Sequence, residues 1–129
     1  MEAIAIVEKL NKLDYTLIEH KLSEDGYSRK KISEMKNEGL RFIALCASKK
    51  GPFTPSPLVD EFWHQTILCT KLYFKIADIC GNYIHHTPND GSAKARAQDN
   101  NYFWDGIQAY EDTFGEPNLK IWGLKRRKK

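Results

Sequence analysis

Helical periodicity most constrains how this chain can fold, and it is strongest in the segment that follows Ser56 and Pro57. Apolar residues recur there every three or four positions as far as Gly81, as they do on the buried face of a helix. Ser is a favourable N-cap, Pro is favourable at the first helical position, and Gly is a favourable end. The pattern predicts one long central helix from Pro57 to about Cys80.

Similar patterns flank this segment, and the alternation typical of strands is almost missing. Short apolar stripes precede Gly26, a longer one follows Ser28, and another resumes near Ser92 and ends at Gly115. The apolar residues beyond that last helix indicate a short arm that packs back on the others. We therefore expect an all-α fold, a single compact domain of four to five helices with a C-terminal arm, over residues 1–124.

Cysteine content and hydropathy exclude several classes of protein. The three cysteines are odd in number and widely spaced, which argues against a disulfide framework and a four-cysteine zinc site. The pattern predicts buried free thiols at Cys46 and Cys69, and Cys80, near the paired histidines His85 and His86, is either a third free thiol or a ligand. No apolar run approaches the roughly 18 residues that span a bilayer, and the first residues lack the features of a signal peptide. A cytoplasmic protein without a membrane-spanning segment is the expectation.

The positive charge of the chain is concentrated at its end. Residues 125–129 are all Lys or Arg, so they supply the whole net charge of +3 and leave residues 1–124 net acidic. We expect these five residues to form a basic disordered tail. A basic tail can associate weakly with nucleic acid, but no recognisable nucleic-acid module accompanies it, so specific nucleic-acid binding is not expected.

Asp60 and His64 form the first half of a candidate site. They lie four residues apart near the start of the predicted central helix, so their side chains share one face. Both can ligate a divalent ion, or the carboxylate can orient an imidazole that does so. His85 and His86 form the second half. About 30 Å of straight helix would separate Asp60 from Gly81, so the halves meet only if the helix breaks early or the later segment folds back.

The same four residues also fit a simpler interpretation. Asp60 and His64 could be an ordinary pair on a solvated helix face, and His85 and His86 could cap carbonyl groups at a turn. No Gly-rich phosphate loop and no recognisable nucleophile motif offers a different chemistry. The residues therefore suggest a site without naming a reaction.

Three blocks of the sequence resemble a known family. They are residues 55–64 with the pattern Asp-x-x-Trp-His, residues 83–88 with the pattern Tyr-Ile-His-His-x-Pro, and the pair of C-terminal patterns within residues 110–122. Together they are similar to the bacterial branch of the glycine-rich domain-containing protein-like family. The resemblance implies an isolated helical module whose site uses Asp60, His64 and one or both of the paired histidines. This chain departs from the family pattern at two positions: it has Thr66 where many relatives carry His, and Ala77 where a Cys is common.

We interpret the chain as a small helical protein with a divalent-metal or polar functional site. Its expected metal ligands are Asp60, His64, His85 and His86, and its expected supporting residues are Trp63, which should be buried, and Tyr73. Nitrogen and oxygen ligands suit zinc or iron, and an open coordination position would permit metal-assisted hydrolysis or oxidation. The alternatives are a non-catalytic protein-interaction module with a structural His/Asp cluster, and weak nucleic-acid association through the basic tail.

Overall fold

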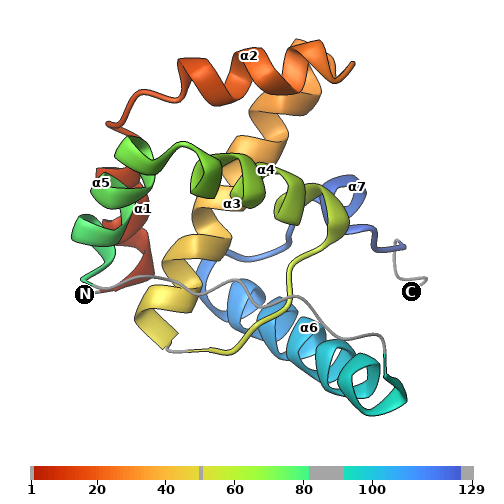
Figure 1. Ribbon diagram of the computed structural model, residues 1–129. Coiled ribbons are helices and arrows are strands. Elements are labelled where there is room, and N and C mark those ends of the chain that lie inside the picture. The colour runs from red at the N-terminus through yellow and green to blue at the C-terminus, as the bar shows by residue number, and fades with distance from the viewer. Residues whose placement is uncertain (1, 50, 82–91, 126–129) are drawn as a thin grey trace.

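The helix α3 is the element around which the rest of the protein packs. The computed structural model describes residues 2–49, 51–81 and 92–125, and α3 spans Arg29–Lys49. Within that part of the chain α3 contacts each of the other six helices (Figure 1). Its buried face includes Met35, Phe42 and Leu45.

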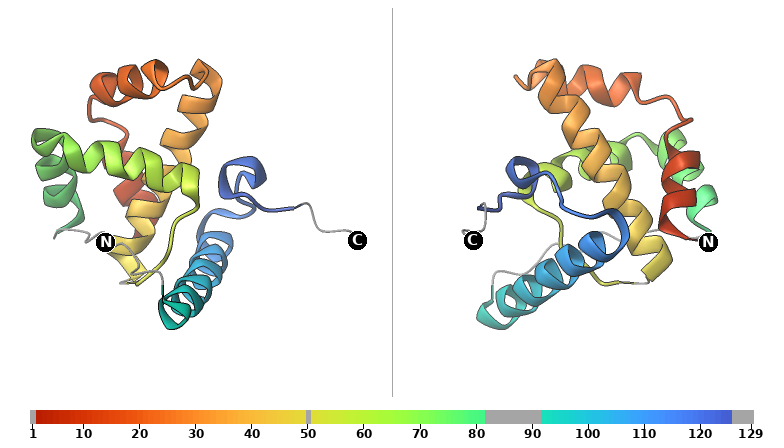
Figure 2. Two further views of the ribbon diagram at one scale, coloured as in Figure 1. Left: turned by 45° about the vertical axis from the view of Figure 1, so that its right-hand side comes forward. Right: turned by 180° about the vertical axis from the view of Figure 1, so that it is seen from behind.

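The described residues form seven helices and no strand, so the predicted all-α class is confirmed. Besides α3 they are α1 (Ala3–Leu10), α2 (Thr16–Glu24), α4 (Pro57–Leu68), α5 (Thr70–Cys80), α6 (Ala93–Phe114) and α7 (Leu119–Trp122). Figure 2 shows α2 beside the first turns of α3, with α6 at the opposite end of the molecule. The predicted number of four to five helices is wrong, because the central helix is divided and the arm contains a helix of its own.

The start signals identified in the sequence are used in the structure. Pro57 is the first residue of α4, and the Oγ of Ser56 accepts a hydrogen bond of 3.3 Å from the Val59 amide. Ser92 caps α6 in the same way, because its Oγ accepts from the Ala95 amide at 3.1 Å. These bonds satisfy amides that have no carbonyl partner in the first turn of a helix.

The single long helix predicted after Pro57 is wrong, because the chain breaks at Cys69. This residue has φ −91° and ψ 84°, and it separates α4 from α5. Its amide is shared between the carbonyls of Gln65 and Thr66, at 3.3 and 3.2 Å. The Thr66 hydroxyl donates to the Trp63 carbonyl at 2.6 Å, and such bonds between a side chain and the preceding turn compete with the helix ladder. After the break α5 packs against α1 and α3.

The arm predicted after α6 folds back onto the helices. Gly115 ends α6 with φ 87°, a conformation that favours glycine. Residues 116–124, here called the C-terminal arm, contain α7 and bury Ile121 and Trp122. Lys125 beyond the arm is exposed, and residues 126–129 of the predicted tail lie outside the described residues.

Buried apolar side chains from all seven helices belong to one hydrophobic cluster. The largest fully buried side chains in it include Trp122, Tyr110, Phe42 and Phe62. In the part of the chain that the structure describes, no helix is both long enough and apolar enough to cross a bilayer.

Replacing Gly39 by alanine is expected to lower the free energy of unfolding by about 1–3 kcal/mol. Gly39 lies on the buried face of α3, where an added Cβ would collide with the ring of Phe62 in α4. The Phe62 side chain is itself fully buried, so it has little room to move away. The collision should outweigh the gain of about 1 kcal/mol in helix propensity. Chemical denaturation would measure the change.

Asn37→Ala is the matched control for Gly39→Ala, because Asn37 is exposed on the same helix. That control should leave stability unchanged or raise it slightly, since propensity is all that changes. Adding Phe62→Leu to Gly39→Ala should recover part of the loss. A Gly39→Ala variant as stable as the Asn37→Ala control would show that the two helices do not approach as closely as described.

Candidate functional site

The first turns of α4 carry Asp60 and His64. The amide of Asp60 donates to the Ser56 carbonyl at 2.8 Å, which makes it one of the first residues held by the helix ladder. Asp60 is partly buried and His64 is exposed, whereas Phe62 and Trp63 between them are buried. The backbone rises by about 6 Å along the helix axis from Asp60 to His64. The helix thus presents a carboxylate and an imidazole toward its surface over an aromatic backing.

The aromatic backing is centred on Trp63. Its side chain is 3 % exposed, so the predicted burial is confirmed, and its ring meets that of Phe42 edge-on at 5.5 Å. Tyr73 lies on α5, where it is partly buried against the hydrophobic cluster. The supporting roles of Trp63 and Tyr73 stay predictions.

The break at Cys69 removes the obstacle of a long straight helix. With α4 ending at Leu68, only about 12 Å of helix lies beyond Asp60 in place of the expected 30 Å. Figure 1 shows α5 turning away from the line of α4. An early break was one of the two conditions under which the halves of the candidate site could meet, and the helix does break early. His85 and His86 themselves lie outside the described residues.

The described residues do not complete a metal site around Asp60 and His64. Among them, no group of three or more His, Cys, Asp or Glu side chains could hold a metal ion. The three cysteines are free and partly buried. Burial raises the pKa of Cys46 to about 12, and the proximity of the Cys80 thiol adds to the rise. Burial likewise raises the pKa of Cys80 to about 11. Both thiols are therefore protonated at neutral pH, and either would have to lose its proton to ligate a metal.

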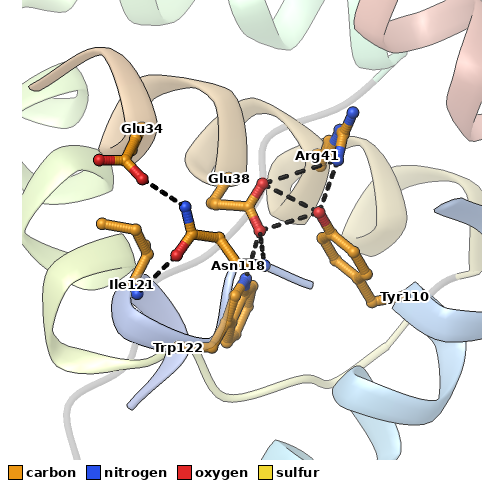
Figure 3. A network of polar contacts seen from close by, with 7 residues as sticks. All are labelled: Glu34, Glu38, Arg41, Tyr110, Asn118, Ile121 and Trp122. Carbon is orange, nitrogen blue, oxygen red and sulfur yellow. Dashed lines mark hydrogen bonds and ion pairs between the residues drawn. The ribbon is translucent and has the colours of Figure 1, made fainter. Parts of the chain in front are cut away.

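A second polar cluster, absent from the sequence-based expectations, surrounds the buried side chain of Glu38 in α3 (Figure 3). Its Oε1 accepts hydrogen bonds from the Tyr110 hydroxyl at 2.8 Å, the Asn118 amide at 3.0 Å and the Trp122 Nε1 at 3.0 Å. Its Oε2 lies 2.9 Å from the same hydroxyl and 3.7 Å from the guanidinium of Arg41. A carboxylate that is only 4 % exposed is thus surrounded by donors and one positive charge.

Arg41 connects this cluster to the surface. Its Nη1 donates to the Tyr110 hydroxyl at 2.7 Å, and its guanidinium lies over the rings of Tyr110 and Phe114. Burial disfavours its charged form, but the hydrogen bond to Tyr110 and the charge of Glu38 raise its pKa overall. For Tyr110, in contrast, burial raises the pKa, so the hydroxyl keeps its proton. Tyr110 is therefore a neutral donor between a carboxylate and a guanidinium.

The Glu38 cluster joins the C-terminal arm to α3. Asn118 adds a second connection, because its side-chain amide donates to Glu34 at 2.6 Å while its Oδ1 accepts from the Ile121 amide. The oxygens of Glu38 are occupied by protein donors, so the arrangement suits a structural anchor better than an acid or base in a reaction. The sequence did contain a signal, since Glu38 falls on the apolar face of α3 between Met35 and Phe42.

The fold and the polar pair on α4 define a small all-helical protein with a candidate His/Asp site near the start of a short helix. A comparison with protein-family models matches residues 9–108 to the UCP032817-like family, and the chain belongs to that family. The description of the family names no reaction, substrate or ligand. The glycine-rich designation suggested by the sequence resemblance stays a prediction. Comparisons with curated proteins and with solved structures find no match.

Proposed function

We propose that this protein binds a divalent metal ion, zinc or iron, at Asp60 and His64. His86 is the proposed third ligand and His85 its alternative. The placement of Asp60 and His64 one turn apart near the start of α4, with their backbone held by a capped turn, carries the proposal. Imidazole nitrogen and carboxylate oxygen are suitable ligands for either metal.

The position of Asp60 one turn before His64 is compatible with two roles. Asp60 can ligate the metal directly, or it can orient the imidazole of His64 from one turn away. With three protein ligands a coordination position stays open, and a bound metal would supply acidified water for hydrolysis or a centre for oxidation. A cytoplasmic location stays a prediction from the sequence.

Protein purified without an affinity tag should contain zinc or iron, and His64→Ala should weaken metal binding by more than about 100-fold. Loss of a residue that only orients a ligand costs about 10- to 100-fold, so loss of a ligand should cost more. Elemental analysis and zinc titration would measure both effects. Binding should weaken as pH falls, because a protonated imidazole cannot ligate a metal. Full occupancy maintained well below about pH 5 would exclude histidine ligands.

His20→Ala is the matched control for His64→Ala. His20 is exposed on α2, and its Nε2 is 2.8 Å from a carboxylate oxygen of Glu24, four residues later. It therefore reproduces a His–carboxylate pair at helical spacing without the aromatic backing of α4. Its removal should not change metal content. Equal losses in the two variants would indicate adventitious binding to surface histidines.

A protein-interaction module is the second candidate function, and exposed apolar side chains favour it. Leu68 at the end of α4 is 62 % exposed, and Trp104 on α6 is 50 % exposed. Single exposed apolar residues are common on soluble proteins, so these two side chains weigh less than the α4 pair. A protein without metal, whose His64→Ala variant behaves as wild type, would favour this second candidate.

A further inference from the structure

One serine hydroxyl joins the start of α4 to the C-terminal arm. Ser56 is 1 % exposed, and its Oγ donates to the Ile121 carbonyl at 2.8 Å while accepting from the Val59 amide. The serine before α3 offers a contrast, because Ser28 is exposed and its Oγ accepts from the Lys31 amide of its own helix at 3.1 Å. Ser56 thus serves two elements that lie 65 residues apart in the chain.

The arm also reaches α4 through a series of aromatic rings. The Trp122 ring lies 5.9 Å from that of Phe42, and Phe42 lies 5.5 Å from Trp63, the residue before His64. Trp122 is in turn fixed at its Nε1 by the carboxylate of Glu38. Two routes therefore run from the arm to α4, one at its N-cap and one beneath the candidate ligands.

From these contacts we infer that the C-terminal arm positions Asp60 and His64 in the first turns of α4, with Ser56 as the positioning residue. The amides in the first turn of a helix are held only by its cap and by the first ladder bonds. The hydroxyl that caps this turn is oriented by the arm, and the next amide bound to Ser56 is that of Asp60, at 2.8 Å from the Ser56 carbonyl. A loosened arm therefore frees the turn that carries Asp60. The consequence for metal binding rests on the function proposed above.

Trp122→Phe and Ser56→Ala, alone and together in the full-length protein, test this inference. Trp122→Phe removes the indole donor to Glu38 without changing charge near Asp60. Amide hydrogen exchange followed by NMR should be about five-fold faster at Asp60 in Ser56→Ala, which is the effect expected from loss of a cap. In Trp122→Phe it should be faster than in wild type by up to the same factor. In the Ser56→Ala background, Trp122→Phe should add little at Asp60, because the cap through which the arm reaches the first turn of α4 is already absent, and the aromatic series contacts α4 only at Trp63. Zinc affinity should fall in parallel.

Three further variants make the result decisive. Ser56→Thr keeps the hydroxyl and should restore exchange and zinc affinity toward wild type. Ile6→Val, at a buried position of α1, controls for general destabilisation and should change neither the exchange rate at Asp60 nor the zinc affinity. Asn118→Ala loosens the arm without touching an aromatic ring and should repeat the effect of Trp122→Phe.

Amide exchange at Asp60 tests the role of the arm, and zinc binding tests the proposed function, so the two proposals can fail separately. If the wild-type protein does not bind zinc, the proposed function fails, while the exchange rates at Asp60 still decide whether the arm positions α4. Faster exchange at the arm with no change at Asp60 would overturn the inference. Equal effects of Trp122→Phe with and without Ser56→Ala would also overturn it, because the arm would then not act through Ser56.

Discussion

Glu38→Ala is expected to lower the free energy of unfolding by about 3–5 kcal/mol, which is the usual cost of breaking a buried charged contact by removing one partner. The substitution leaves the Tyr110 hydroxyl, the Asn118 amide and the Trp122 Nε1 without their common acceptor. Each buried donor left unpaired costs about 1–3 kcal/mol. The free energy of unfolding of a small protein is only about 5–15 kcal/mol, so this loss would be a large part of it. Urea denaturation followed by circular dichroism would measure the loss.

Glu34→Ala provides the control for Glu38→Ala on the same face of α3, one turn earlier. Glu34 is only partly buried and accepts one bond, from the side chain of Asn118. Its loss should cost about 1 kcal/mol. A double-mutant cycle of Glu38→Ala with Tyr110→Phe should show strong coupling, because the two side chains share hydrogen bonds. If Glu38→Ala cost no more than Glu34→Ala, the buried carboxylate would not be what holds the arm.

Helix ends were the part of the fold that the sequence predicted best. Ser56 and Pro57 mark the start of α4, Ser92 marks the start of α6, and Gly115 marks its end. Each signal is local, because a cap bond or a left-handed residue depends on a few neighbouring positions. The all-α class could be predicted for the same reason, since helical periodicity is also a local property.

The break at Cys69 was not predictable from such signals. The sequence there contains neither Gly nor Pro, and the apolar pattern continues across it. The break depends on the Thr66 hydroxyl bonding to the preceding turn and on the packing of α5 against α1 and α3. Tertiary contacts of this kind override periodicity, and a single sequence does not reveal them.

The candidate site was predictable only in part. The spacing of Asp60 and His64 fixes their placement on one helix face, because four residues make about one turn. The burial of Trp63 also followed from the pattern. The role of Glu38 did not, since its donors come from residues more than 70 positions later in the chain. A charged residue on an apolar helix face is nevertheless a usable signal, because such a residue is rarely buried without partners.

Trp63→Ala is the second variant with a large expected effect, a loss of about 3–5 kcal/mol in the free energy of unfolding. The side chain is 3 % exposed and its ring meets Phe42 edge-on, so truncation leaves a cavity beneath the polar face of α4. Phe42 also contacts Trp122, so the cavity borders the aromatic series that connects α4 to the C-terminal arm. Thermal and chemical denaturation would measure the loss.

Trp104→Ala is the matched control for Trp63→Ala, because Trp104 is 50 % exposed on α6. The same truncation at a half-exposed position should cost much less, since little buried space is left empty. The milder variant Trp63→Phe should stay folded and allow zinc titration. A loss of zinc affinity in Trp63→Phe beyond that in Trp104→Ala would indicate that Trp63 braces His64. Should Trp63→Ala cost less than about 1 kcal/mol, the ring would contribute little to the core, and the metal site would lose the backing on which its geometry depends.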